Sequence, residues 1–214
     1  MAEQRTAVDR DRAARAALDV LAETGMDGLT VRRVAARLGV RAPALYWHFA
    51  NKRELLDVMT DVIVRPVTDA LGEPGPKRPW WRWLDDGSVA LWRALLGHRD
   101  GARVALGAGL MGARSLGTFT DRCTEVLRDA GFGPADGTRT AGALVHFVVG
   151  RAVEDQSRPD DATAAAVFAD PGFPFPALAA GMRERHAAGA TREDDFRYAL
   201  AIMITGLRTL NNDR

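Results

Sequence analysis

Apolar residues recur in this chain at the three- and four-residue spacing of an α-helix along almost its whole length. One such face consists of Ala14, Ala17, Leu18 and Leu21. Residues 55–63 supply a broader one. No run alternates apolar and polar residues with the β-branched side chains that favour a strand. The pattern therefore predicts an all-α fold.

Capping and helix-ending residues delimit the first two predicted helices. Thr6 and Asp9 fit a capping-box pair before the first helix, which we expect to end at Gly25. Thr30 is a suitable N-cap for a short second helix, and Gly39 is a suitable stop after it. We therefore expect the second helix over Val31–Leu38.

A third helix is predicted over residues 42–49. Pro43 is tolerated in its first turn, because backbone amides at that place have no partner inside the helix and the N–H that proline lacks is not needed. Asn51 is expected to cap a fourth helix. Pro66 should kink this helix or lie near its end. The segment 72–79 is rich in Gly and Pro, which predicts a loop.

Helical spacing continues beyond this loop to the C-terminal region. Further helices are predicted over residues 81–97, 100–106, 116–130, 136–156, 175–188 and 192–210. A long loop is expected over 157–174. The predicted organisation is a three-helix N-terminal domain, a connecting helix and a C-terminal helical domain, over residues 1–50, 51–71 and 72–214.

Charge is distributed unevenly along the chain, although the formal net charge is only +1. Residues 1–53 hold ten basic and six acidic residues, a balance of +4, and the remaining residues have a balance of −3. Segment 28–53 has no acidic residue and six basic ones, namely Arg32, Arg33, Arg37, Arg41, Lys52 and Arg53. Such a run is often only a solvated face. Its confinement to one short motif favours a surface that faces phosphate groups.

Small and apolar residues within Thr30–Phe49 have the spacing of a helix-turn-helix. Ala35 is the fifth residue of the second predicted helix, where a small side chain lets two helices cross closely. Gly39 follows in the turn, and Val40 and Leu45 occupy apolar positions. The second helix of this motif enters the major groove of DNA. Any tight helical hairpin favours Ala and Gly at these places. The spacing alone therefore does not distinguish a DNA-binding motif from an ordinary helical hairpin.

The side chains of the third predicted helix favour DNA binding. The rings of Tyr46, Trp47 and His48 can pack on sugars while their polar groups reach phosphates; for Tyr46 and Trp47, core packing is the alternative. Arg32 and Arg41 can each make bidentate contacts to guanine. The complete set of predicted DNA-binding residues is Thr30, Arg32, Arg41, Ala42, Pro43, Ala44, Tyr46, Trp47, His48 and Lys52, with Thr30 and Lys52 directed at phosphates.

Composition argues against membrane, disulfide-rich and metal-dependent classes. No stretch of about 18 apolar residues is free of charges and helix breakers, and the first residues lack an apolar signal core, so we expect a cytoplasmic protein without a membrane partner. A single cysteine, Cys123, cannot form a disulfide framework or a four-ligand zinc site. The four histidines have no metal-ligand spacing, and no metal site is predicted: His48, His98, His146 and His186.

Two enzyme-like patterns lack the context that would give them meaning. Residues 107–112 match G-x-G-x-x-G, but no strand is predicted before them, so we expect a flexible loop and no nucleotide cofactor. Cys123 has no neighbouring histidine that could act as a base. We expect no catalytic residues and no enzymatic activity. The alternative is a helical small-molecule-binding protein or enzyme whose N-terminal helices merely pack.

The segment GLTVRRVAARLGVRAPALYWHFANKRELLD resembles the N-terminal DNA-binding domain of the TetR family of bacterial repressors. Three later segments resemble the ligand-binding and dimerisation domain of its tetracycline-repressor branch: 94–107, 146–156 and 196–207. The resemblance implies a homodimer on double-stranded operator DNA, with a small-molecule pocket in each C-terminal domain. It also implies a four-helix dimer interface from the 136–156 and 192–210 helices. Binding of the inducer is implied to move the fourth helix and to separate the two DNA-binding domains.

Several residues depart from those that hold tetracycline and magnesium in that branch. Ala105 occupies the position of a magnesium-binding histidine. Gly87 and Leu91 replace an asparagine and a phenylalanine that contact the drug, and Gly109 and Leu110 replace an Arg-Pro pair. The resemblance with these departures predicts a small-molecule inducer other than tetracycline–magnesium, larger and more apolar.

Other residues of the expected pocket come from several helices. His146 and Glu154 match pocket residues of the family. Apolar side chains are available nearby, for each of which plain core packing is the alternative role. The predicted ligand-binding residues are Thr68, Trp83, Gly87, Leu91, Trp92, Leu110, Met111, Phe119, His146, Phe147 and Glu154.

Overall fold

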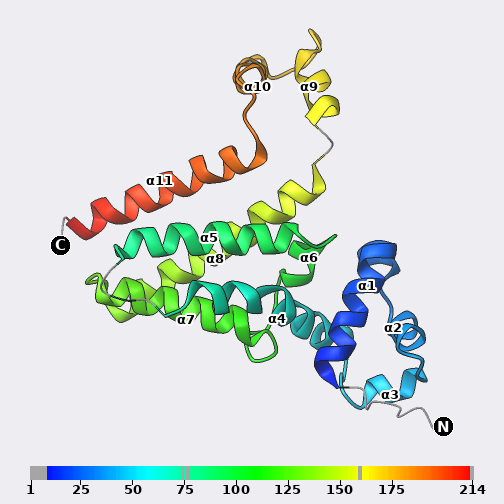
Figure 1. The fold of residues 1–214 in the computed structure, drawn as a ribbon. Helices are drawn as coiled ribbons and strands as arrows, with labels where there is room; N and C mark the ends of the chain where they lie inside the picture. Colours follow the sequence, from blue (N-terminus) through cyan, green and yellow to red (C-terminus); the bar gives the residue numbers. More distant parts are fainter. Residues whose placement is uncertain (1–8, 74, 76–77, 159–160, 213–214) are drawn as a thin grey trace. The chain divides into compact units, whose positions relative to one another are not determined.

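A computed structural model confirms the all-α prediction (Figure 1). It describes residues 9–73, 75, 78–158 and 161–212. Across these ranges the chain forms helices and no strand. The helices are α1 (Arg10–Gly28), α2 (Val31–Leu38), α3 (Ala42–Tyr46), α4 (Lys52–Leu71), α5 (Trp80–Leu96), α6 (Gly101–Ala105), α7 (Arg114–Asp129), α8 (Pro134–Ser157), α9 (Asp161–Ala169), α10 (Pro176–Ala187) and α11 (Arg192–Asn212). None of these described helices is long and apolar enough to cross a bilayer.

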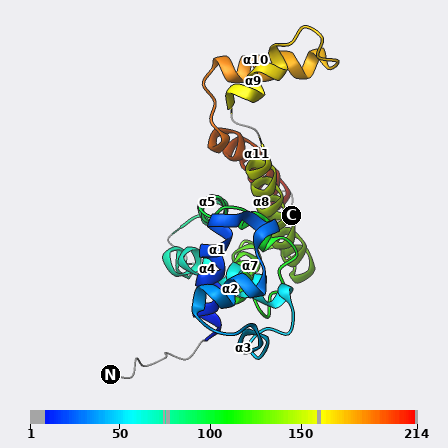
Figure 2. The ribbon, with the colours of Figure 1, turned by 90° about the vertical axis from the view of Figure 1, so that its right-hand side faces the viewer.

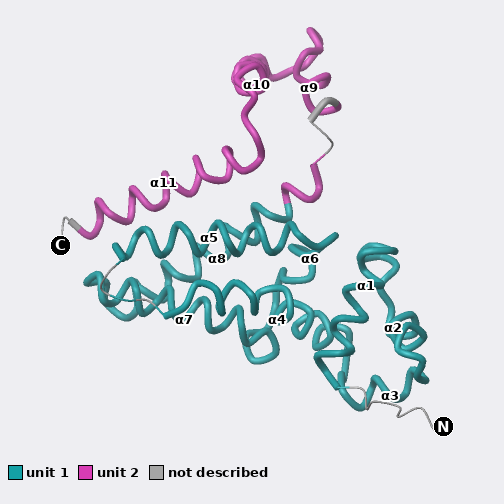
Figure 3. Tube along the Cα trace, viewed as in Figure 1, with its two compact units in different colours: residues 1–153 teal, residues 154–214 magenta. Residues whose placement is uncertain are grey.

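The chain divides into two compact units, unit 1 up to Val153 and unit 2 from Glu154 (Figure 3). The division falls near the end of α8. Unit 1 contains the N-terminal helices, the connecting helix and the helices up to most of α8. The domain boundaries at residues 50 and 72, which bracket α4, stay a prediction.

Helices α1, α2 and α3 form a three-helix group beside the first half of α4, and we call this group the reading head (Figures 1 and 2). Asp9 caps α1 by accepting the Arg12 amide at 2.7 Å, whereas Thr6 lies outside the described residues. Thr30 caps α2 by accepting the Arg33 amide at 3.3 Å. Gly39 ends α2 in the left-handed region, with φ 67° and ψ 27°. The predicted bounds of α2 are thus confirmed.

Two predicted helix ends were wrong by a few residues. Gly25 leaves helical geometry as expected (φ 68°, ψ −178°), but a further helical turn continues α1 to Gly28. Helix α3 stops at Tyr46 instead of continuing to Phe49. The amides of His48 and Phe49 both donate to the Leu45 carbonyl, so the chain turns there and buries the Phe49 ring before α4 begins.

Helix α4 connects the reading head to the rest of unit 1. Asn51 accepts the Glu54 amide at 3.0 Å, and the Glu54 carboxylate accepts the Ala50 amide at 3.1 Å, which completes a reciprocal N-terminal cap. The helix continues through Pro66 to its end at Leu71. Buried residues lie on more than one side of α4, which packs against α1, α5, α6 and α7.

The long loop predicted over residues 157–174 is wrong in its centre, because α9 occupies Asp161–Ala169. The Pro and Asp residues at both ends of this segment favour a loop, but the sequence between them is rich in alanine, which has the highest helix propensity. In unit 2, α9 packs against α10. The rings of Phe168 and Phe173 lie 5.2 Å apart, and Phe175 continues this cluster at 5.5 Å from Phe173.

Gly39→Ala should lower the free energy of unfolding by about 1 kcal/mol, because the left-handed conformation brings a Cβ too close to the backbone. No atom lies within 4 Å of a Cβ built at this position, so the effect isolates backbone strain from crowding. Urea denaturation measures it. Gly39→Asn is the matched control and should cost less, since asparagine visits this region more readily. Equal losses for Ala and Asn would contradict the explanation.

Candidate functional site

The aromatic residues at the end of α3 are held by two buried anchors. Leu45 and Phe49 are buried in the reading head. Between them, Tyr46 is 56% exposed and Trp47 is 89% exposed. Trp47 therefore does not belong to the core, and most of Tyr46 faces solvent. His48 is half-buried beside Phe49. An indole held in water at this position by a folded turn is available to an external partner.

Three of the six basic residues in segment 28–53 are engaged in holding the fold together. The Arg33 guanidinium donates to the Gly28 carbonyl at 2.8 Å and so ties α2 to the end of α1. Arg37 pairs with Glu23 at 2.5 Å. The Arg53 guanidinium pairs with Asp57 of the same helix at 2.7 Å, and it donates at 2.9 Å to the carbonyls of Val104 and Leu106.

The other three basic residues are Arg32, Arg41 and Lys52, and all are exposed. Within the described ranges their side chains form no hydrogen bond or ion pair with the rest of the chain. These are the three for which the sequence predicts contacts to DNA. Thr30 is also exposed, at the N-terminus of α2. The remaining predicted residues, Ala42, Pro43 and Ala44, form the first turn of α3 and are exposed or half-buried.

The predicted pocket residues of α5 and α7 pack against each other. The rings of Trp83 and Phe119 stack with centroids 6.2 Å apart and planes inclined by 22°. A Cβ at Gly87 would lie 3.0 Å from both Phe119 and Leu71. The space left by the missing side chain at Gly87 is therefore filled by these neighbours, and it does not open a cavity.

Other predicted pocket residues lie on α4, on the loop before α7 and on α8. Thr68 is buried on α4, where its hydroxyl donates to the Arg65 carbonyl. Leu110 is half exposed and Met111 is 87% exposed, on the loop before α7. His146 and Glu154 are both exposed on α8, eight residues apart in the sequence.

The remaining predicted members are Leu91 and Trp92, which are buried in α5, and Phe147, which is half-buried in α8. The loop expected over residues 107–112 follows a helix, α6, as predicted. One of its amides, that of Gly109, donates to Asp57 of α4 at 3.1 Å. The structure thus places Trp83 and Gly87 against Phe119, whereas Leu110, Met111, His146 and Glu154 are exposed on other elements.

A cavity of about 340 Å³ opens between the start of α5 and the end of α7. Its walls are mainly apolar, with one basic and one acidic residue, and consist of Gly75, Arg78, Trp80, Trp83, Val126, Asp129 and Ala130. Trp83 is the one predicted ligand-binding residue among them. The others were missed, although the Trp-Trp-Arg-Trp sequence at 80–83 is an unusual concentration of indoles and could have signalled them.

Comparison with protein families matches both halves of the chain. Residues 14–59 match the model of bacterial regulatory proteins of the tetR family. Residues 73–211 match the model of the tetracyclin repressor-like C-terminal domain. The chain is 39% identical to the tetracycline repressor protein class C of Escherichia coli, over 72% of this chain and 69% of that one. It is 36% identical to the class A repressor from transposon 1721 of Escherichia coli, over 90% of this chain and 87% of that one.

Solved structures agree over nearly the whole chain. A possible TetR family transcriptional regulator from Streptomyces coelicolor A3(2) has a TM-score of 0.80 and 35% identity, over 94% of this chain and all of that one. ActR from Streptomyces coelicolor, in complex with (S)-DNPA, has a TM-score of 0.78 and 28% identity, over 95% and 98% of the two chains. BioQ, with its natural double-stranded DNA operator, has a TM-score of 0.68 and 26% identity, over 94% and 98%.

The two groups of basic residues should respond differently to truncation. Arg33→Ala should lower the free energy of unfolding by about 1 kcal/mol, since it removes a tie between α1 and α2. Arg41→Ala should change it by less than about 0.5 kcal/mol, because the side chain contacts nothing that stabilises the fold. Chemical denaturation of the two variants in parallel measures the difference. A loss for Arg41→Ala as large as for Arg33→Ala would refute the division into engaged and available residues.

Proposed function

Because the chain belongs to the TetR family of bacterial regulatory proteins, we propose that it is a transcriptional repressor that binds a palindromic operator and releases it when a small molecule binds. One observation carries the DNA-binding part. Arg32, Arg41 and Lys52 have no partner within the described chain, while the other three basic residues of the same segment are bound internally. Exposed cations without internal partners are available for phosphates and base edges.

Each available residue has a distinct proposed role. Arg41 at the start of α3 and Arg32 on α2 contact guanine edges in the major groove. Lys52 neutralises a phosphate, and Thr30 with the first amides of α2 holds another. Trp47 packs on the sugar-phosphate backbone, which gives its exposed indole a buried environment in the complex.

A homodimer would place two such heads on one operator. Helix α11 carries large apolar side chains that are exposed in the single chain, at Tyr198, Ile202 and Leu210. On α8 the exposed side contains His146 and Gly150. We propose that these surfaces of α8 and α11 form the dimer interface, because burial of exposed aromatic and aliphatic groups favours association.

We further propose that the inducer is an apolar, aromatic small molecule and not tetracycline–magnesium. Ala105 is buried and offers no metal ligand. The site of the missing asparagine, Gly87, is filled by Phe119. The cavity lined by Trp80 and Trp83 has a volume typical of small-ligand sites, and its indoles offer flat apolar walls. ActR, one of the similar structures, is in complex with (S)-DNPA.

The second candidate is a helical ligand-binding protein or enzyme that does not bind DNA. Burial raises the pKa of the Cys123 thiol to about 12, so this group stays protonated at neutral pH and is a poor nucleophile. This argues against catalysis by Cys123. The two candidates differ in whether the purified protein selects one DNA sequence over others.

Footprinting of the DNA upstream of the chain's own gene should show a palindrome with half-sites about 34–36 Å apart. Arg41→Ala should weaken binding by ~1–3 kcal/mol and relax specificity at one base position. Lys52→Ala should weaken binding to all sequences and reduce the slope of log K against log salt by about 1. Arg183→Ala, on the exposed surface of α10, is the control and should leave both unchanged. Absence of any sequence preference at moderate salt would refute the repressor function.

Operator complexes should survive tetracycline and magnesium chloride, and the apo protein should bind operator equally well with and without EDTA. The physical reason is that Ala105 cannot coordinate a metal ion and Phe119 fills the place of a polar drug contact. Fluorescence anisotropy of labelled operator DNA measures both. Release by tetracycline that requires magnesium would contradict this account of the pocket without affecting the DNA-binding proposal.

A further inference from the structure

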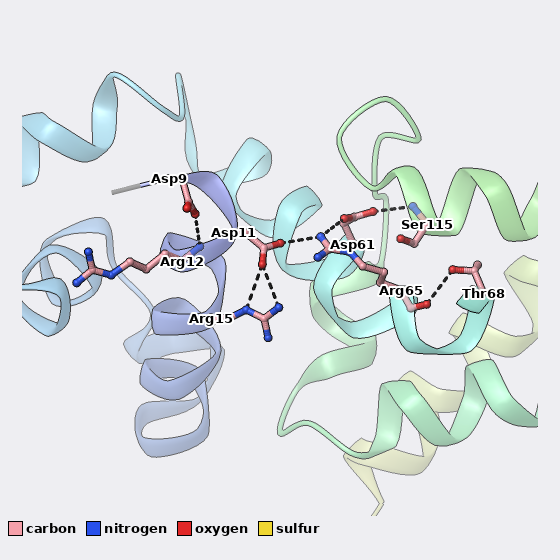
Figure 4. Close-up of polar contacts among 8 residues, drawn as sticks. All are labelled: Asp9, Asp11, Arg12, Arg15, Asp61, Arg65, Thr68 and Ser115. Atoms are coloured by element: carbon pink, nitrogen blue, oxygen red, sulfur yellow. Dashed lines mark hydrogen bonds and ion pairs between the residues drawn. The ribbon is translucent and has the colours of Figure 1, made fainter. Parts of the chain in front are cut away.

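A continuous chain of charged and polar groups joins three helices of unit 1 (Figure 4). One nitrogen of Arg65, on α4, lies 2.7 Å from Asp11 of α1 and 2.7 Å from Asp61 of its own helix. The other oxygen of Asp61 accepts the amide of Ser115 at 2.6 Å. Ser115 is in the first turn of α7. The path therefore leads from the reading head, through α4, to the start of α7.

Asp61 replaces the cap that α7 does not have. The residue at the cap position, Ala113, makes no side-chain hydrogen bond to the helix. The first amides of a helix have no partner inside it and carry partial positive charge, so a carboxylate there is stabilising. The Asp61 side chain is 14% exposed. Burial alone would raise its pKa, but the hydrogen bonds from Arg65 and Ser115 outweigh this and hold the pKa below its usual value.

Arg65 is the shared member of the path. Hydrogen bonds to Asp11 and Asp61 raise its own pKa, so it remains charged at every pH at which the protein folds. Among the described residues Arg65 forms no hydrogen bond or ion pair with α7, and Asp61 forms none with the reading head. Charge-assisted hydrogen bonds depend steeply on geometry. Displacement of the Ser115 amide would thus move Asp61, which in turn changes how Arg65 holds Asp11.

We propose that Arg65 and Asp61 are positioning residues that couple the first turn of α7 to the orientation of the reading head. The part that concerns operator affinity rests on the proposed function. The coupling itself is a property of the folded chain. Helix α7 begins directly after the loop that carries Met111 and ends at the cavity beside Trp83, so a change at either place reaches α1 by this path.

Hydrogen exchange of the DNA-free, full-length protein tests the coupling. In Arg65→Met, Asp61 loses its cation and should turn toward water, which releases the Ser115 amide. We expect this amide to exchange about 10-fold faster or more, although Arg65 does not bind it. Arg15→Met is the matched control, because Arg15 also pairs with Asp11, at 3.0 Å, but only within α1. Unchanged exchange at Ser115 in Arg65→Met, or equal acceleration in Arg15→Met, would overturn the proposal.

Operator affinity tests the consequence for function. Asp61→Asn retains an oxygen for Ser115 but loses the charge that holds Arg65. It should bind the DNA upstream of the chain's own gene about 5-fold more weakly or worse, while Arg15→Met stays within about twofold of the unchanged protein. If the unchanged protein shows no sequence preference, the proposed function fails and the exchange result still decides the coupling. If the unchanged protein binds and Asp61→Asn binds equally well, the link from α7 to the reading head is refuted.

Discussion

The burial of α4 on several sides is the constraint on which the rest of unit 1 depends. A helix that packs against α1, α5, α6 and α7 at once cannot keep a purely polar face. Two of its charged residues are bound to other elements, Arg53 to α6 and Arg65 to α1. The Arg65 tie fixes α1 of the reading head against α4, and the Arg53 tie fixes α4 against α6. The packing of α4 therefore positions the reading head against the rest of unit 1.

The helices whose ends are set by local chemistry could be predicted from the sequence. Thr30 and Gly39 act within a few residues of their own position, and the bounds of α2 follow from them. The end of α3 could not be predicted, because it depends on the burial of Phe49 in the tertiary structure. The alanine-rich helix α9 was missed since Pro and Asp residues at its flanks suggested a loop, whereas propensity within the segment determined the outcome.

In the candidate site, too, the sequence gives the local features of the six basic residues but not their tertiary contacts. The sequence identified the cluster, but internal pairing depends on distant partners, such as Glu23 for Arg37 and Val104 for Arg53. The pocket was harder to predict. A glycine at position 87 suggests space when it is read along the chain, yet Phe119, from another helix, fills that space. The residue type shows which side chain a position lacks, but only the tertiary structure shows whether a neighbour fills the space.

This difference also explains how one reading head can serve chains with different ligands. The exposed residues of α2 and α3 need only a short hairpin anchored by Leu45 and Phe49, so they tolerate changes elsewhere. The proposed ligand region is built from the faces of α5 and α7, where replacing one side chain repacks its neighbours. A sensing domain can therefore change its ligand without disturbing the DNA contacts, provided that α4 keeps its ties to both. The Asp11–Arg65–Asp61 path supplies such ties from α4 to α1 and α7, and none of its members is among the predicted DNA-binding residues or in the walls of the cavity.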